Sequence, residues 1–295
     1  MTGAACRTAV VIGLMSAALM LAACGGSGTS SSQTSARVVP EHVVRAPKRI
    51  LAATAPQPNG IIWALAGGHS AGLFEMDSPS GHISGSVSVS GAARSLAESS
   101  TGVLGVAIGT NRAGALELLD GRTTKVIRTV ALPAPARDVV VGSDGTTFYV
   151  LTGWANSASV TIVNSQNGRI RGTVPVPTNT DSIAPDVQQT LLYVLERDGN
   201  VSEISISDGK VMARFSVGHD PGLSLALSPD GSQLYVLKGT DAVANVAVVD
   251  VATESVRRVL PAPSHCLEVL VSASGGQLFE VAGTAGYGNI QVFAV

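Results

Sequence analysis

The sequence is poor in charged and aromatic side chains. Only 14% of its 295 residues are charged and 4% are aromatic, although 45% are hydrophobic. Soluble domains usually carry about 25% charged residues, so the composition excludes a charge-rich coiled coil and a disordered acidic chain. The 19 basic residues are balanced by 21 acidic ones, which leaves a net charge of −2. Because such a chain has no basic field for a phosphate backbone, we expect no nucleic-acid partner.

Cysteine is also scarce. The three cysteines are Cys6, Cys24 and Cys266. The first lies in a segment that we expect to be cleaved and the second in an expected lipidation motif, so Cys266 has no partner for an intramolecular disulfide. His265 precedes it, but a catalytic Cys and His meet in space rather than in sequence. We therefore expect Cys266 to have a packing role.

Motifs for a metal, a cofactor or a nucleophile are missing from the sequence. It contains no Gly-x-Ser-x-Gly elbow, no phosphate-binding Gly-Lys-Ser/Thr loop, no dinucleotide fingerprint and no closely spaced histidine pair. Acidic or amide residues do recur before turns, but there they are better interpreted as caps of those turns. The residues of this series are Asp77, Asp120, Asn164, Asp208 and Asp250. We expect no catalytic residue, no metal and no cofactor.

The first residues read as an export signal. Residues 1–7 carry one cation and no acid, and the apolar run 8–23 follows. A membrane-spanning helix needs about 20 apolar residues, so this run is short for a span and typical of a signal peptide. We predict that residues 1–23 are removed.

The end of this run, Leu21-Ala22-Ala23-Cys24, resembles the lipobox of bacterial lipoproteins. The resemblance implies that Cys24 receives a diacylglyceryl group and anchors the protein to the cell membrane on its extracytoplasmic side. The alternative is an ordinary secretory signal cut near Ala23, with Cys24 incidental.

Two short segments follow the predicted anchor. Residues 24–36 hold no large apolar side chain and are expected to form a flexible Gly/Ser tether. Residues 37–49 carry a net charge of +3, whereas residues 50–295 carry −6, from 14 basic and 20 acidic groups. The basic neck could lie against anionic headgroups or simply be solvated, and both interpretations stay open.

A repeat fills residues 50–295. Tyr149, Tyr193, Tyr235 and Phe279 occupy the same place in successive copies, at spacings of 44, 42 and 44 residues. Each copy reads as short strands separated by turn signals such as Ser-Pro-Asp-Gly. Four strands in a period of about 40–45 residues are typical of β-propeller blades. We predict an all-β propeller of six four-stranded blades, with seven as the alternative.

The sixth copy lacks an outer strand, because the sequence ends at Val295 after its third strand. An exposed sheet edge favours aggregation. The apolar stretch 38–44 has no local partner, so we predict that it pairs with residues 290–293 and closes the ring.

The strings Ser-Pro-Asp-Gly-Ser-Gln-Leu-Tyr-Val and Val-Ala-Val-Val-Asp-Val-Ala-Thr resemble the YVTN-type β-propeller repeats of bacterial and archaeal surface and periplasmic proteins. The resemblance covers about residues 50–295 and is strongest over 210–260. This sequence departs from the family in having Tyr-Val-Leu where the family has Tyr-Val-Thr-Asn, and in having six units where seven are common.

The predicted propeller places a set of polar residues at one face. Fourth-to-first and second-to-third connections share the face that usually binds ligands, and Arg94 and Arg137 fall at equivalent places in neighbouring blades. Two guanidiniums at the channel mouth suit a carboxylate, unless they pair with Asp138 or Asp181 and only hold loops. The candidates for this face are Arg94, Arg137, Asp181, His219, Asp220, His265 and Trp154.

Two classes of function fit these features. The first is a lipid-anchored, extracytoplasmic scaffold that binds another envelope protein or a ligand. The second is an enzyme of the lactonase or quinoprotein type, as some propellers of related build are. The lack of a catalytic constellation favours the scaffold.

Overall fold

A computed structural model describes residues 40–46, 49–56, 60–67, 71–78, 80–89, 92–110, 113–154, 157–284 and 286–295. The predicted signal peptide, Cys24 and the tether lie outside the described residues. Within the described part of the chain, no helix is long and apolar enough to cross a membrane.

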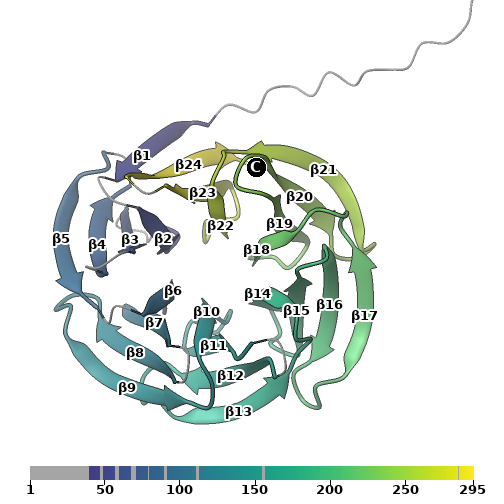
Figure 1. Ribbon diagram of the computed structural model, residues 1–295, viewed down its shortest axis with the longest axis horizontal. Helices are drawn as coiled ribbons and strands as arrows, with labels where there is room; N and C mark the ends of the chain where they lie inside the picture. The colour runs from purple at the N-terminus through teal and green to yellow at the C-terminus, as the bar shows by residue number, and fades with distance from the viewer. Residues whose placement is uncertain are drawn as a thin grey trace, which may run out of the picture. The chain divides into compact units, whose positions relative to one another are not determined.

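The described residues form six four-stranded antiparallel sheets arranged as blades around one axis (Figure 1). The first three blades are β2 (Ile50–Ala53), β3 (Ile61–Ala66), β4 (Gly72–Asp77) and β5 (Ile83–Ser88); β6 (Ala93–Glu98), β7 (Val103–Gly109), β8 (Gly114–Asp120) and β9 (Val126–Leu132); and β10 (Ala136–Val141), β11 (Thr147–Thr152), β12 (Ser159–Asn164) and β13 (Ile170–Pro175). The fourth and fifth are β14 (Thr180–Pro185), β15 (Leu191–Glu196), β16 (Asn200–Ser205) and β17 (Val211–Ser216); and β18 (Gly222–Leu227), β19 (Gln233–Gly239), β20 (Ala244–Asp250) and β21 (Ser255–Ala262). The sixth is β22 (Cys266–Val271), β23 (Gln277–Gly283) and β24 (Gly288–Ala294), completed by β1 (His42–Ala46). The prediction of a six-bladed propeller is confirmed.

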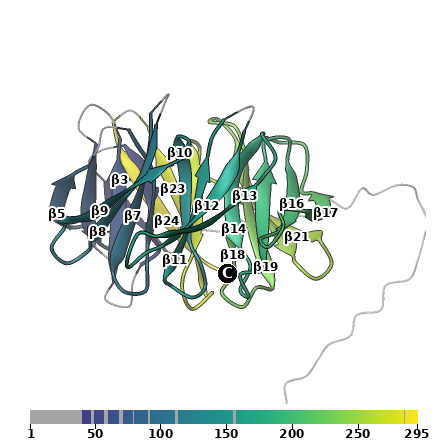
Figure 2. The same cartoon turned by 90° about the horizontal axis from the view of Figure 1, so that it is seen from below.

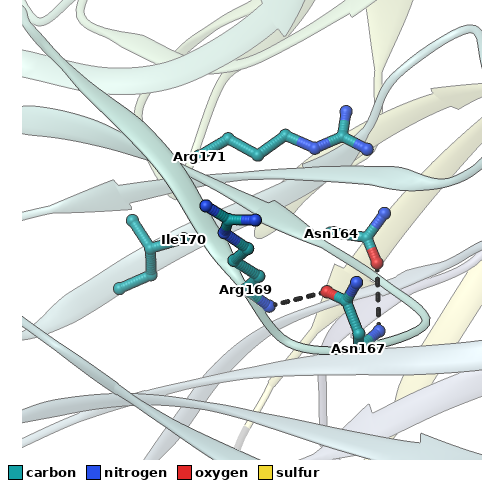
Figure 3. Close-up of a pocket in the computed structure, with 5 residues that line it drawn as sticks. All are labelled: Asn164, Asn167, Arg169, Ile170 and Arg171. Carbon is teal, nitrogen blue, oxygen red and sulfur yellow. Dashed lines mark hydrogen bonds between the residues drawn. The ribbon is translucent and has the colours of Figure 1, made fainter.

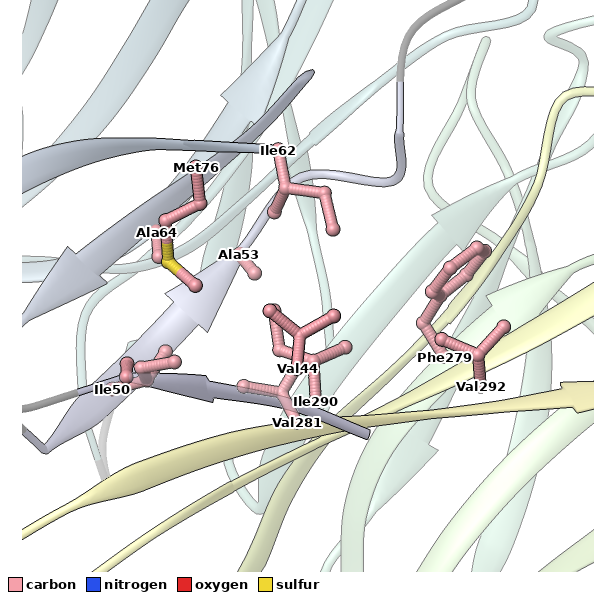
Figure 4. Close-up of a cluster of buried hydrophobic side chains, with 11 residues drawn as sticks. Val44, Ile50, Ala53, Ile62, Ala64, Met76, Phe279, Val281, Ile290 and Val292 are labelled. Atoms are coloured by element: carbon pink, nitrogen blue, oxygen red, sulfur yellow. The ribbon is translucent and has the colours of Figure 1, made fainter. Parts of the chain in front are cut away.

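Strand β1 closes the ring, as the sequence predicted. It pairs antiparallel with β24, and Val44 lies opposite Ile290. Val44 is 2% exposed and belongs to the apolar cluster between the sixth and first blades, together with Met76 and Phe279 (Figure 4). The strand begins at His42, within the apolar stretch 38–44, and extends past it to Ala46. Along it the buried Val44 and Ala46 alternate with the exposed Val43 and Arg45, as expected for a strand with one face against the core.

The composition follows from the contacts between blades. Second strands are buried along their length, since both of their faces meet neighbouring blades; β11 reads Thr-Phe-Tyr-Val-Leu-Thr and every residue is buried. Small residues allow the blades to approach closely. Gly105 of β7 stands where other blades have Tyr149 or Tyr193, and a Cβ there would lie 3.0 Å from the Phe148 ring.

The strands run between two ends of the ring, and the loops gather there (Figure 2). We call the end with the fourth-to-first and second-to-third connections the upper end, and the other the lower end. At the lower end Asp77, Asp120, Asn164 and Asp250 end their third strands and cap the third-to-fourth turns, as predicted, whereas Asp208 lies three residues past the end of β16 at Ser205. Asp120 Oδ1 accepts the backbone N–H of Arg122 at 2.9 Å and of Thr123 at 2.8 Å, and Asn164 Oδ1 accepts that of Asn167 at 3.0 Å.

Candidate functional site

Each innermost strand has the same irregularity near its start. The register with the second strand slips between Ala93 and Ser95, between Ala136 and Asp138, and at the equivalent place in the other blades. Such a bulge re-aims the side chain of the extra residue. The residues at this position in the first to sixth blades are Leu51, Arg94, Arg137, Asp181, Leu223 and Leu267. Arg94 and Arg137 therefore are equivalent, as their spacing indicated, and Asp181 is the third polar member.

Arg137 and Asp181 form an ion pair across adjacent blades. Arg137 Nη2 donates to Asp181 Oδ1 at 2.9 Å. Arg197, from the connection between β15 and β16, donates from Nε to Asp181 Oδ2 at 3.0 Å and from Nη2 to Oδ1 at 2.8 Å. Two guanidiniums thus share one carboxylate, which leaves the group with an excess positive charge.

Trp154 completes this cluster at the upper end. Arg137 Cζ lies 4.4 Å from the centroid of the Trp154 ring, a cation–π distance. The Arg137 side chain is 9% exposed, whereas Trp154 is 51% and the Arg197 side chain 66% exposed. Burial lowers the pKa of Arg137. The neighbouring carboxylate of Asp181 raises it and so opposes that change. The bond to Asp181 raises the pKa of Arg197. We call Arg137, Asp181, Arg197 and Trp154 the arginine cluster.

The other candidates lie at the same end but outside this cluster. Arg94 is exposed and forms no ion pair with any described residue. His219 and Asp220 are exposed before β18, and Asp220 Oδ2 lies 3.8 Å from Nζ of the buried Lys238. His265 donates its backbone N–H to Asp241 O at 2.8 Å. The structure thus brings Arg137, Asp181 and Trp154 together and leaves the remaining four apart from them.

A second polar feature lies one residue past the bulge. The side chain at that position accepts a backbone N–H from the innermost strand of the next blade. Ser95 Oγ accepts from Val139 at 3.2 Å, Ser182 Oγ from Leu225 at 3.3 Å, Ser224 Oγ from Val269 at 3.2 Å and Glu268 Oε2 from Ala53 at 2.8 Å. In the first blade the equivalent residue is Ala52, which has no side-chain acceptor. We call this set the inner belt.

Asp138 links three blades within the inner belt. Its Oδ1 accepts the hydroxyl of Ser95 at 2.9 Å, and its Oδ2 accepts that of Ser182 at 3.1 Å. Burial raises the pKa of Asp138, and the two serine hydroxyls oppose that rise. The pKa of Glu268 is raised well above its ordinary value, mainly by burial and further by the charge of Asp138.

Sequence reasoning missed the inner belt. Ser95, Asp138, Ser182, Ser224 and Glu268 lie 42 to 44 residues apart, each directly after the bulge position. That spacing was a usable signal. The residue types differ, however. What they share is that they accept a backbone N–H from the next blade, and that contact exists only in the folded ring.

Cys266 lies at the start of β22 and is buried between the fifth and sixth blades. Burial strongly raises the pKa of its thiol, and Sγ donates to Glu268 O at 3.7 Å. A thiol held neutral in this way is a poor nucleophile, which agrees with the expected packing role. No group of three or more His, Cys, Asp or Glu residues that could hold a metal occurs in the described part of the chain.

Comparison with known proteins identifies the fold. No family model matches the sequence, and no curated protein matches it. Among solved structures, the β-propeller domain of Myceliophteria thermophila Cps50 (Swd1) is similar, with a TM-score of 0.60, 12% identity, and coverage of 88% of this chain and 99% of that one. At this identity the likeness shows a β-propeller alone. The resemblances to lipoproteins and to YVTN-type repeats stay predictions.

Proposed function

We propose that this protein is a lipid-anchored binding scaffold at the extracytoplasmic side of the cell membrane, and that its arginine cluster binds an acidic group of a partner protein or ligand. The arginine cluster is the observation that carries the proposal. It combines an excess positive charge with an exposed aromatic ring at the upper end of a rigid propeller.

The chemistry of the cluster favours a carboxylate. Asp181 is already satisfied by Arg137 and Arg197, yet most of the Arg197 side chain remains exposed. Arg94, one blade away, adds a guanidinium that forms no ion pair with any described residue. Guanidinium groups bind carboxylates in a bidentate manner, and Trp154 offers a flat apolar surface for the rest of an acidic side chain or chain terminus.

Covalent capture from membranes tests the binding half of the proposal. The protein is crosslinked in intact cells and purified, and the adducts are compared between the native chain and the double variant Arg94→Ala, Arg137→Ala. We expect a reproducible adduct that the double variant loses. Arg45→Ala with Arg258→Ala is the matched control, because both side chains are exposed on outer strands. An adduct equally strong in all three chains would contradict the proposal.

The anchoring half depends on Cys24 and has its own test. Cys24→Ser removes the thiol that would carry the diacylglyceryl group, so the processed variant should leave the membrane fraction. Mass spectrometry of the native N-terminal peptide should show the added lipid. Membrane retention of an otherwise processed Cys24→Ser chain would count against lipidation.

A further inference from the structure

The outer strands of three consecutive blades begin in the same unusual way. A cation ends the third-to-fourth turn, and a β-branched apolar residue follows as the first residue of the strand. The pairs are Lys125 with Val126, Arg169 with Ile170, and Lys210 with Val211. Val126 is 54%, Ile170 41% and Val211 55% exposed. We call these six residues the lower rim.

Most of the cations near the lower rim form no ion pair with a described residue, although Arg122 lies in the turn that Asp120 caps. Arg122 and Arg128 flank Lys125, and Arg171 follows Ile170. Together with Lys125 and Arg169, they form no ion pair with any residue in the described ranges. Lys210 pairs with Asp208 at 2.8 Å, but both side chains are exposed, so water weakens that pair.

Cations of the second and third blades approach each other at the turn before β13. Gly168, in the turn before β13, has a φ of +68°, and a Cβ at this position would clash with Cδ of Arg128 from β9. The arginine stem therefore packs directly on the neighbouring turn. The missing side chain at Gly168 leaves room for this contact.

The turn of the third blade holds its cations in a fixed arrangement (Figure 3). Asn164 Oδ1 accepts the backbone N–H of Asn167 at 3.0 Å, and Asn167 Oδ1 accepts that of Arg169 at 2.9 Å. These three residues, with Ile170 and Arg171, line a shallow pocket. Ile170 and Arg171 leave the strand in opposite directions (Figure 3). An apolar side chain and two cationic side chains are thus exposed on opposite sides of the same short segment.

The lower rim lies at the end of the ring where the chain enters β1. In the sixth blade His42 pairs with Val292 and Ala46 with Gly288, so β1, like β9, β13 and β17, starts at the lower end. Residues 25–39 separate Cys24 from Pro40. At about 3.3–3.6 Å per residue, this stretch spans at most about 54 Å. An anchor at Cys24 would hold the lower end near the bilayer.

We propose that the lower rim is a second binding surface, distinct from the arginine cluster, and that it lies on an anionic lipid bilayer. Equivalent positions of successive blades lie at the same height along the ring axis, so they suit a flat partner. The cations contact headgroup phosphates, and the Val and Ile side chains insert at the boundary between the headgroups and the acyl chains. A nucleic-acid backbone would use the cations but leave the apolar residues exposed. The arginine cluster at the upper end then faces away from the membrane.

Binding of the lower rim to a bilayer does not require the diacylglyceryl group on Cys24. Only the orientation of the ring in the cell rests on the proposed anchor. The test therefore uses the chain from residue 24 onward with Cys24→Ser, which lacks both lipid and leader but keeps all of the ring. It is mixed with vesicles of phosphatidylcholine alone or of phosphatidylcholine with phosphatidylglycerol, and bound protein is measured by sedimentation. We expect binding to the phosphatidylglycerol vesicles only, weakening as salt is added.

Three variants of this chain separate the contributions. Each cation close to an anionic surface is worth about fivefold in binding, so Lys125→Glu, Arg169→Glu, Lys210→Glu together should weaken binding by about 100-fold or more. The matched control Arg49→Glu, Arg94→Glu, Arg197→Glu makes the same charge change toward the upper end and should bind almost as well as the parent. Val126→Ser, Ile170→Ser, Val211→Ser should weaken binding without removing its salt dependence.

Equal binding by the lower-rim and upper-end charge variants would overturn the proposal. So would binding of soluble polyphosphate with no binding of phosphatidylglycerol vesicles, since the cations would then serve a soluble polyanion. All substituted side chains are exposed, and thermal unfolding of each variant checks that the ring is intact. Because the chain carries no lipid, a failure here leaves the test of Cys24 unaffected.

Discussion

Glu268 and Ala53 are 215 residues apart in sequence, yet Glu268 Oε2 accepts the backbone N–H of Ala53 at 2.8 Å. This bond joins the innermost strands of the last and first blades. The pairing of β1 with β24 joins the same two parts of the chain at the outer edge. The ring is therefore closed twice, once near its axis and once at its circumference.

The inner closure predicts a difference between two substitutions of Glu268. Glu268→Ala leaves the Ala53 N–H without its acceptor, so the free energy of unfolding should fall by about 1–3 kcal/mol. Glu268→Gln keeps a side-chain oxygen and should lose less than half of that. Urea denaturation measures both. Equal stability of the native and Ala chains would show that the bond contributes nothing to closure.

The outer closure is tested by two neighbouring valines of β1. Val44 is 2% exposed, whereas Val43 is 42% exposed. Val44→Asp places an unpaired charge in the cluster between the sixth and first blades and should cost about 3 kcal/mol or more. Val43→Asp, the matched control, should change stability by no more than about 0.5 kcal/mol.

Hydrogen exchange gives a local readout of the same pair of variants. If β1 detaches in Val44→Asp, the β24 amides that pair with it should exchange faster than in Val43→Asp. The freed β24 edge should also promote association between copies, visible by light scattering. Unchanged protection of β24 in Val44→Asp would contradict the closing role of β1.

Glu280 is a buried acid in an apolar place. It follows Phe279 in β23, where Val150 and Val194 follow the tyrosines of the third and fourth blades. Its Oε2 accepts no hydrogen bond from any residue that the structure describes. Burial raises the pKa of Glu280 from 4.5 to about 8. Glu280→Val should therefore stabilise the ring at neutral pH.

The pH dependence of that gain has a definite sign. The pKa of Glu280 is higher in the folded state than in the unfolded state, so its ionisation costs the native ring no stability below about pH 4.5 and an increasing amount as the pH rises through about 8. Each pH unit is worth about 1.4 kcal/mol, so the total is on the order of 5 kcal/mol. The difference in unfolding free energy between Glu280→Val and the native chain should grow over this range. A constant difference would rule out titration of Glu280.

The sequence predicted the repeated features and missed those formed between repeats. Each blade needs its own turns and buried strands, so their signals recur and reveal six blades; the same spacing indicated that Arg94 and Arg137 are equivalent. The start of β1 was less clear, because it depends on which side chains β24 and the first blade bury. The inner belt was missed because Ser95 and Glu268 look unrelated until each meets the backbone of the next blade.

The binding of an acidic group by the arginine cluster is the central claim, and Trp154 can report on it. The chain has two tryptophans, of which Trp63 is buried and Trp154 exposed. In a Trp63→Phe variant, the emission should come from a ring that contacts Arg137. The measurement is a fluorescence titration of this variant with a short polyglutamate peptide, with a polylysine peptide as control.

We predict a saturable change in Trp154 emission with polyglutamate and none with polylysine. Loss of one charged hydrogen-bond partner costs about 1.5–3 kcal/mol, so Arg197→Ala should weaken binding by about tenfold or more, while Arg258→Ala on the outer strand β21 should leave it unchanged. Emission that does not respond to polyglutamate, or an affinity that Arg197→Ala does not alter, would contradict the claim.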